Sequence, residues 1–377
     1  MENTSFVPND LTKRKHFDIL DGSLSCVLFI VLQYVLALII AFTGGLTNKF
    51  LYDLFSAIMQ FSFVGAVIII AKIRKVDWIY ASNFKKKIDG KIVLCALGLA
   101  VICLVLFTDI TSAFMAMLEK LGYSSPLNSG KVAEYNQITN IWEYLVSIVT
   151  VCIIPPLCEE TLFRGAVLNS FRGFNKWIGI FVSGFCFMIM HGNPDQTIHQ
   201  FILGLILGYI AWETRNIWVC VLIHAINNFI AITITFVYSL LGSGQTGEII
   251  DATTQVTEYS WSEIIYTLAI GIAAAVFGVF LVKKLTKIIK EKSDKLNAVK
   301  QENQEVTEQV STQPQPVEML VTQDGLTQKV IEPSVAEENY QKKPTKLKLA
   351  LTILTYMAFA AYFINEWVGY LLVGLGI

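Results

Sequence analysis

Nine apolar stretches divide this chain, and most of them are long enough to cross a lipid bilayer. A helix needs about twenty apolar residues to span the hydrocarbon core. The stretches lie at residues 24–43, 51–71, 91–109, 142–163, 177–191, 199–213, 217–240, 262–282 and 349–376. The mean hydropathy of +0.55 and the 54% of apolar residues exceed those of soluble domains. The sequence therefore predicts an all-α fold, a polytopic membrane helix bundle with about nine transmembrane helices.

Lysine and arginine are concentrated in alternate connections between these stretches. The basic connections are 13–15, 72–87, 172–176, 215 and 283–295. By contrast, the connection 241–261 contains neither residue. Because cytoplasmic loops carry an excess of lysine and arginine, we predict a cytoplasmic N-terminus and a C-terminus outside. The expected location is a bacterial plasma membrane.

The distribution of polar residues suggests four regions. Residues 1–22 form a cytoplasmic N-terminal arm, 23–284 form the transmembrane domain, 285–346 form a cytoplasmic polar linker, and 347–377 form a C-terminal transmembrane helix. The linker is rich in Lys, Glu and Gln and then contains Gln313-Pro-Gln-Pro316. It cannot bury enough apolar area to become ordered, so we expect an insert that is largely disordered. Its first third could prolong the preceding helix, because apolar residues recur there at helical spacing.

Two glycines, Gly204 and Gly208, form a Gly-x-x-x-Gly pattern within the stretch 199–213. In membranes this pattern usually allows close packing of two helices. It could also let a substrate chain approach the backbone, and the sequence leaves both interpretations open.

Six polar or ionisable residues lie inside the apolar stretches within seventy residues of one another. They are Glu159, Glu160, Arg164, His191, His224 and Asn228. Ionised groups in hydrocarbon cost several kcal/mol each, so they rarely occur there without a function or a partner. Counted at 1.5 Å per helical residue, all six come within about 6 Å of one membrane depth. We therefore predict one shared site, with a kink at Pro156 just ahead of the glutamates.

The spacing of these residues suggests separate roles for the two glutamates. Glu160 and Arg164 are four residues apart, so they share a helix face and can pair. Glu159 is rotated by about 100° and has no such local partner. A buried carboxylate without a close cation takes up a proton more readily, as a general base must. We predict that Glu159 activates water and that Glu160 and Arg164 support it. The alternative without chemistry is a Glu–Arg network that joins two helices.

The two histidine segments have the same four-residue spacing, Phe187 to His191 and His224 to Asn228. His191 could share the attacking water with Glu159. His224 and Asn228 could donate hydrogen bonds to the oxyanion of a tetrahedral intermediate. A lone histidine in a membrane often only bonds to a neighbouring helix, so this assignment depends on the whole set.

The ordered motifs Glu-Glu-x-x-x-Arg, Phe-x-x-x-His and His-x-x-x-Asn resemble those of the CAAX protease and bacteriocin-processing (CPBP or Abi) family. The resemblance covers about residues 140–235, which we take as the catalytic core. It implies an intramembrane endopeptidase in which Glu159 and His191 activate water while His224 and Asn228 stabilise the oxyanion. Eukaryotic members trim the last three residues of prenylated CAAX proteins. Bacterial members act in peptide maturation or bacteriocin self-immunity, and the sequence does not choose between these substrates.

Cofactors and partners follow from the same residues. Glu159, Glu160, His191 and His224 could ligate zinc, but there is no His-Glu-x-x-His pair, and we predict catalysis without a metal. None of the seven cysteines forms a Cys-x-x-Cys pair, so a thiolate zinc site is not indicated. The expected partners are the lipid bilayer and a membrane-associated protein or peptide substrate, with no nucleic acid. A protein partner for residues 285–346 is a further option.

Two functions of other classes compete with proteolysis. A non-catalytic membrane scaffold or regulator could keep the same fold, and eroded motifs would be its usual sign. A small-solute transporter would show inverted repeats and two interrupted helices at matching positions. The chain has one such interruption, Pro155-Pro156, and intact motifs.

Overall fold

The computed structural model describes residues 16–42, 49–125, 138–242, 260–311 and 344–377. No strand occurs among these residues, and the all-α prediction is confirmed. In chain order the helical elements are α1 (Ile19–Phe42), α2 (Lys49–Arg74), α3 (Trp78–Ala81), α4 (Gly90–Lys120), α6 (Ile141–Ser147), η3 (Ile148–Ile153), α7 (Ile154–Glu160), η4 (Thr161–Leu168), α8 (Lys176–Ile189), η5 (Pro194–Gln196), α9 (Thr197–Thr214), α10 (Ile217–Gly242), α12 (Trp261–Ser311) and α13 (Lys346–Gly374).

Each of the nine apolar stretches falls largely on helix, and seven of the helices in the described residues are long and apolar enough to cross a membrane. The other two, α8 and α9, have 14 and 18 residues. At 1.5 Å per residue they are about 21 and 27 Å long, shorter than the roughly 30 Å of hydrocarbon. Local chemistry limits the length of α8. The Asn175 side chain caps the start of α8, and Gly192 (φ 65°) follows its end.

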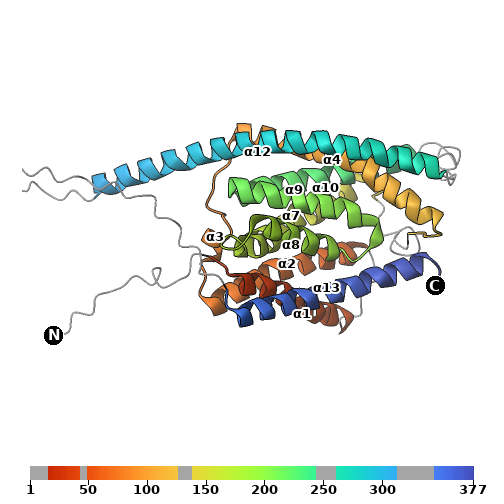
Figure 1. Ribbon diagram of the computed structural model, residues 1–377, viewed down its shortest axis with the longest axis horizontal. Coiled ribbons are helices and arrows are strands. Elements are labelled where there is room, and N and C mark those ends of the chain that lie inside the picture. The colour runs from red at the N-terminus through yellow and green to blue at the C-terminus, as the bar shows by residue number, and fades with distance from the viewer. Residues whose placement is uncertain (1–15, 43–48, 126–137, 243–259, 312–343) are drawn as a thin grey trace, which may run out of the picture.

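The segment 141–168 lies at the centre of the bundle and carries both glutamates (Figure 1). This segment, called the central rod below, is continuously helical. Its helix type changes three times, because π-helical η3 and η4 flank α7. All eight residues of η4 are buried. The segment packs against α2, α8 and α10, and α1 covers η4. A site on this rod is therefore enclosed by helices on several sides.

The Gly-x-x-x-Gly pattern of α9 serves helix packing. A Cβ on Gly204 would lie 2.9 Å from the Cα of Gly184 in α8, and one on Gly208 would lie 3.4 Å from the side chain of Ile180. Because the backbones of α8 and α9 meet here, a side chain at Gly204 would push the two helices apart.

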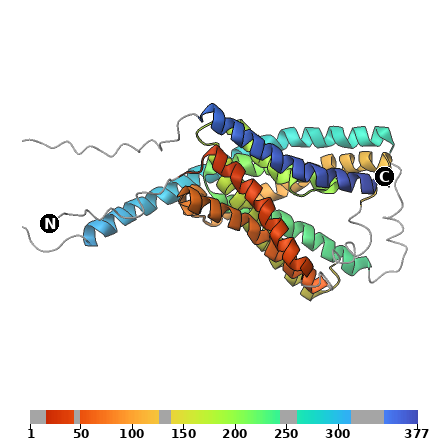
Figure 2. The same cartoon turned by 90° about the horizontal axis from the view of Figure 1, so that it is seen from below.

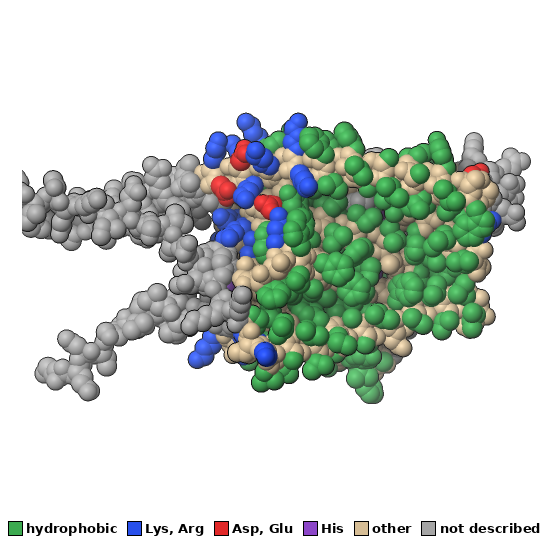
Figure 3. Space-filling view, viewed as in Figure 1, with side chains coloured by type: hydrophobic (Ala, Val, Ile, Leu, Met, Phe, Trp, Pro, Cys, Tyr) green, Lys and Arg blue, Asp and Glu red, His purple; other side chains and the backbone are tan. Residues whose placement is uncertain are grey.

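Basic residues gather at one end of the bundle (Figure 3). The ion pairs at this end join the start of α1 to the end of α2 and the start of α13. Arg74 lies 2.6 Å from Asp21, and Lys348 lies 2.5 Å from Asp18. At the same end Lys290 of α12 lies 3.4 Å from Glu213 of α9. The helix α12 continues from the membrane to Ser311, beyond the other helices, as proposed for the first third of the insert (Figure 1, Figure 2). The remainder of the insert, 312–343, lies outside the described residues.

We expect this basic end to face the cytoplasm, in accord with the excess of lysine and arginine there. A cysteine placed at Ser311 should then react with an impermeant maleimide only after the cells are permeabilised. A cysteine in the connection 241–261 should react in intact cells and serves as the control. Labelling of Ser311→Cys from outside intact cells would reverse the orientation.

Candidate functional site

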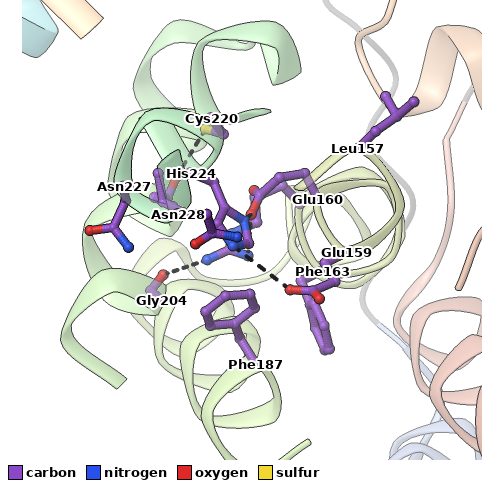
Figure 4. Close-up of polar contacts among 12 residues, drawn as sticks. Leu157, Glu159, Glu160, Phe163, Phe187, Gly204, Cys220, His224, Asn227 and Asn228 are labelled. Atoms are coloured by element: carbon purple, nitrogen blue, oxygen red, sulfur yellow. Dashed lines mark hydrogen bonds and ion pairs between the residues drawn. The ribbon is translucent and has the colours of Figure 1, made fainter. Parts of the chain in front are cut away.

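The centre of the site is a buried triad of Glu160, Arg164 and His224. Figure 4 shows Glu160 and His224 pointing toward each other. Arg164 Nη1 donates to Glu160 Oε1 at 2.9 Å, as the four-residue spacing predicts. The same oxygen lies 3.1 Å from His224 Nδ1. All three side chains are at most 3% exposed. Glu160 thus joins the central rod to α10 through a charged hydrogen bond.

His224 connects the two glutamates. Because the Glu160 carboxylate paired with Arg164 can only accept hydrogen bonds, Nδ1 of His224 carries the proton of their shared bond. The other ring nitrogen, Nε2, lies 3.9 Å from Glu159 Oε2. A carboxylate that holds one imidazole nitrogen in this way orients the ring and fixes the use of the other nitrogen.

Glu159 lacks the hydrogen bonds that Glu160 has. It is 5% exposed, and its Oε2 atom has no hydrogen-bond partner among the described residues. A buried oxygen without a partner is costly and calls for an explanation by strain, catalysis or a bound molecule. The carboxylate therefore has a free acceptor that points at His224.

Arg164 is held from three directions. Besides Glu160, its Nη2 donates to the carbonyl of Gly204 at 3.2 Å. Its guanidinium lies over the ring of Phe187, with Cζ 4.5 Å from the ring centroid. A cation over a desolvated aromatic face gains about 2 kcal/mol. Arg164 is thus a fixed counter-charge for Glu160, and it also ties the central rod to α8 and α9.

His191 lies against Phe187. Its Nδ1 lies 2.9 Å from the Phe187 carbonyl, and its ring centroid lies 5.2 Å from that of Phe187. The Phe187 ring also lies 5.5 Å from the ring of His224. Among the described residues no ion pair joins His191 to either glutamate. The direct cooperation of His191 with Glu159 stays a prediction, and His224 is the histidine that lies next to Glu159.

Asn228 contacts the backbone of the central rod. Its Nδ2 donates to the carbonyl of Val151 in η3 at 2.9 Å. The residues four and five positions after Val151 are Pro155 and Pro156, which have no N–H group. Neither α-helical nor π-helical bonding can satisfy this carbonyl. Asn228 supplies the missing donor, and the bond fixes its amide while leaving a second N–H for another acceptor.

We expect Asn228→Ala to lower both cleavage and stability. Cleavage should fall about a hundredfold or more if the amide is an oxyanion donor. The unsatisfied Val151 carbonyl should lower the free energy of unfolding by about 1–3 kcal/mol. Thermal unfolding in detergent measures this loss.

Pro155→Ala offers a matched control, since it returns an N–H four residues after Val151. In the double variant Pro155→Ala/Asn228→Ala the stability loss from Asn228→Ala should shrink, and the cleavage defect should remain. An Asn228→Ala protein that melts like the wild type would contradict the anchoring role.

Asn227 and His199 lie apart from the glutamates. Asn227 Nδ2 lies 3.3 Å from His199 Nε2 in the first turn of α9. Figure 4 shows Asn227 on the side of α10 away from Glu159. This pair ties α9 to α10 beside the site.

Three contributors to the site were missed by the assignment of roles from sequence. Phe187 contacts both histidines and supports Arg164, Gly204 accepts from Arg164, and the Val151 carbonyl anchors Asn228. The Pro155-Pro156 pair was a readable signal for the last of these, because it removes the two N–H groups that a helix would offer. The contact of Gly204 depends on how α9 packs, which local spacing does not reveal.

A metal site needs several ligands that converge. Within the described part of the chain no group of three or more His, Cys, Asp or Glu side chains has the spacing to hold a metal ion. His191 lies outside the cluster of Glu159, Glu160 and His224 ion pairs. These residues as arranged do not form the four-ligand set considered from the sequence, and catalysis without a metal remains a prediction.

Comparison with known proteins agrees with the three motifs. Residues 141–230 match the family model described as type II CAAX prenyl endopeptidase Rce1-like. An uncharacterized 24.3 kDa protein of Escherichia coli is 30% identical over 91 residues, which cover 22% of this chain and 42% of that protein. The alignment thus spans less than half of that relative's length. No solved structure matches the chain. All six predicted site residues lie within the matched segment.

Proposed function

We propose, from the match of residues 141–230 to the Rce1-like CAAX endopeptidase family model, that this integral membrane protein hydrolyses a peptide bond in a membrane-associated protein or peptide. The observation that carries the proposal is the buried Glu159 carboxylate, whose Oε2 has no hydrogen-bond partner among the described residues and lies 3.9 Å from His224 Nε2. Oε2 of Glu160 is also without a partner, but Oε1 of Glu160 accepts from Arg164 and lies 3.1 Å from His224. Glu159 has only the 3.9 Å contact to His224, and a general base needs such an unpaired acceptor.

In the proposed reaction Glu159 is the general base. A water molecule about 2.8 Å from both Glu159 Oε2 and His224 Nε2 is compatible with their separation of 3.9 Å. Glu159 takes one proton from this water while the water oxygen bonds to the peptide carbonyl carbon. The same carboxyl group then returns the proton to the peptide nitrogen as the C–N bond breaks. One water is consumed, and a carboxylic acid and an amine are released.

The oxyanion of the intermediate needs hydrogen-bond donors that are already in position. His224 and Asn228 are our candidates, since each is held from its other side. Glu160 accepts from His224 Nδ1, which leaves Nε2 to act, and the Val151 carbonyl accepts one N–H of Asn228. When His224 carries two protons, the formal charges of Glu159, Glu160, Arg164 and His224 sum to zero. A neutral cluster reduces the cost of burying these charges in hydrocarbon.

The substrate is expected to be associated with the membrane, because the reacting groups lie among helices of membrane-spanning length. We propose two alternatives for the reaction in the cell. One is CAAX-type processing, and the other is the maturation of bacteriocin-like peptides or self-immunity against them. A non-catalytic scaffold is the alternative function, and no contact described at the site specifically favours it. We place the protein in the bacterial plasma membrane with the N-terminus in the cytoplasm.

Quantitative proteomics of membrane-associated peptides tests the proposed function in the cell. Cells with the wild-type protein should contain product termini that are missing from cells with Glu159→Ala at equal protein level. The intact precursors should accumulate in the variant. If both strains express the protein and their peptide profiles are equal, the scaffold function would be favoured.

A further inference from the structure

A second feature lies between α4 and α12, away from the glutamates. The start of α4 and the middle of α12 enclose a hollow of about 160 Å³, lined by Lys91, Ile92, Cys95, Ile288, Ile289, Glu291, Lys292 and Lys295. Ile92 and Ile289 are at most 1% exposed and form an apolar floor. Three lysines stand against one glutamate at the rim. Such a hollow is amphipathic, with one cationic wall.

The positive charges of this wall are only partly neutralised by ion pairs within the protein. Lys292 lies 3.5 Å from Asp89, the residue that caps α4. No ion pair of Lys91 or Lys295 occurs among the described residues. The hollow also adjoins the N-terminus of a 31-residue helix, where the helix dipole favours an anion. Counting Asp89 with the lining residues, three cations face two anions, which leaves one positive charge.

The depth of the hollow matches the membrane interface. Ser293 of α12 lies 3.4 Å from Asn216, in the turn between α9 and α10, and Lys290 pairs with Glu213 at the end of α9. Tryptophans 177, 212 and 218 lie near these helix ends, as is usual at the headgroup level. The surrounding surface carries most of the lysines and arginines of the visible face (Figure 3).

We propose that this hollow binds a phosphate group, either the phosphodiester of a phospholipid headgroup or free phosphate. A phosphodiester carries one negative charge, which matches the single excess positive charge of the wall. Basic hollows between transmembrane helices on the cytoplasmic side are suited to anionic headgroups. The apolar floor gives a lipid an additional contact that inorganic phosphate lacks. The site would join α12, which lies outside the family segment 141–230, to α4 through a bound anion.

Thermal unfolding of the full chain in a neutral detergent tests the proposal, because a ligand of the folded state raises the unfolding temperature. The probes are dioctanoyl phosphatidylglycerol, dioctanoyl phosphatidylcholine and inorganic phosphate, at matched ionic strength. We expect phosphatidylglycerol to raise the midpoint by about 3 °C or more and phosphatidylcholine to have little effect. An equal rise with inorganic phosphate would support the site and identify free phosphate as its ligand.

Two double variants separate this hollow from general attraction to basic residues. Lys91→Gln/Lys295→Gln removes two charges from the wall and should abolish the rise. Lys283→Gln/Lys284→Gln removes two charges from α12 that neither line the hollow nor pair with a residue lining it, and should retain the rise. Equal loss in both double variants, or an equal rise with phosphatidylcholine, would overturn the proposal.

Discussion

Glu159→Gln should reduce peptide cleavage by about 10²–10⁴-fold, the usual contribution of a general base, while the protein still inserts and folds. Glutamine keeps the size and the hydrogen-bonding capacity of the side chain but cannot take a proton from water. The wild-type Oε2 atom has no hydrogen bond among the described residues, so the substitution breaks none at that atom. Cleavage by purified protein, measured with a substrate identified from the membrane peptides, gives the change in rate.

Folding of the Glu159→Gln variant is checked by its melting temperature and by its elution as a single species in detergent. A matched control is Glu213→Gln, which removes a carboxylate that pairs with lysine near the surface. This control should retain cleavage, since Glu213 lies at the basic end of the bundle. Loss of cleavage in both variants would show that the assay responds to any lost carboxylate.

Arg164→Gln and Glu160→Gln should each destabilise the protein by about 3–5 kcal/mol, as expected when one member of a buried ion pair is removed. Glu160 is 0% exposed and Arg164 is 1% exposed. Without Arg164, the Glu160 carboxylate loses its cation, and the Gly204 carbonyl and the Phe187 ring lose their shared partner. Thermal unfolding in detergent should show this loss for both variants.

Cleavage should also fall in both variants, because His224 loses its fixed orientation when Glu160 is removed or displaced. Glu213→Gln serves again as the control, since partly exposed ion pairs contribute only about 0–1 kcal/mol. Melting temperatures of Arg164→Gln and Glu160→Gln within one degree of the control would contradict the proposed support role.

The helices could be predicted from the sequence because runs of apolar residues with few charges are long in this chain. The division of residues 176–214 into two short helices was also predicted, as the stretches 177–191 and 199–213. Its cause is local, since Asn175 starts α8 and Gly192 with a positive φ follows its end. The continuation of α12 to Ser311 was readable from the helical recurrence of Leu285, Ile288 and Ile289.

The residues of the site could also be predicted from the sequence, whereas their contacts with one another could be predicted only in part. Spacing along one helix predicts neighbours such as Glu160 and Arg164, which the structure contains. Spacing does not specify how two helices are rotated against each other. The contact of His224 with both glutamates, and the position of His191 behind Phe187, depend on the packing of α8 and α10 around the central rod.

The most direct test of the central claim compares Glu159→Gln with Glu160→Gln in cleavage and melting, measured on the same preparations. We expect Glu159→Gln to lose cleavage and keep the wild-type melting temperature, and Glu160→Gln to lose both. Near-wild-type cleavage by Glu159→Gln, or unfolding of Glu159→Gln while Glu160→Gln remains stable, would contradict a catalytic Glu159 supported by a structural Glu160.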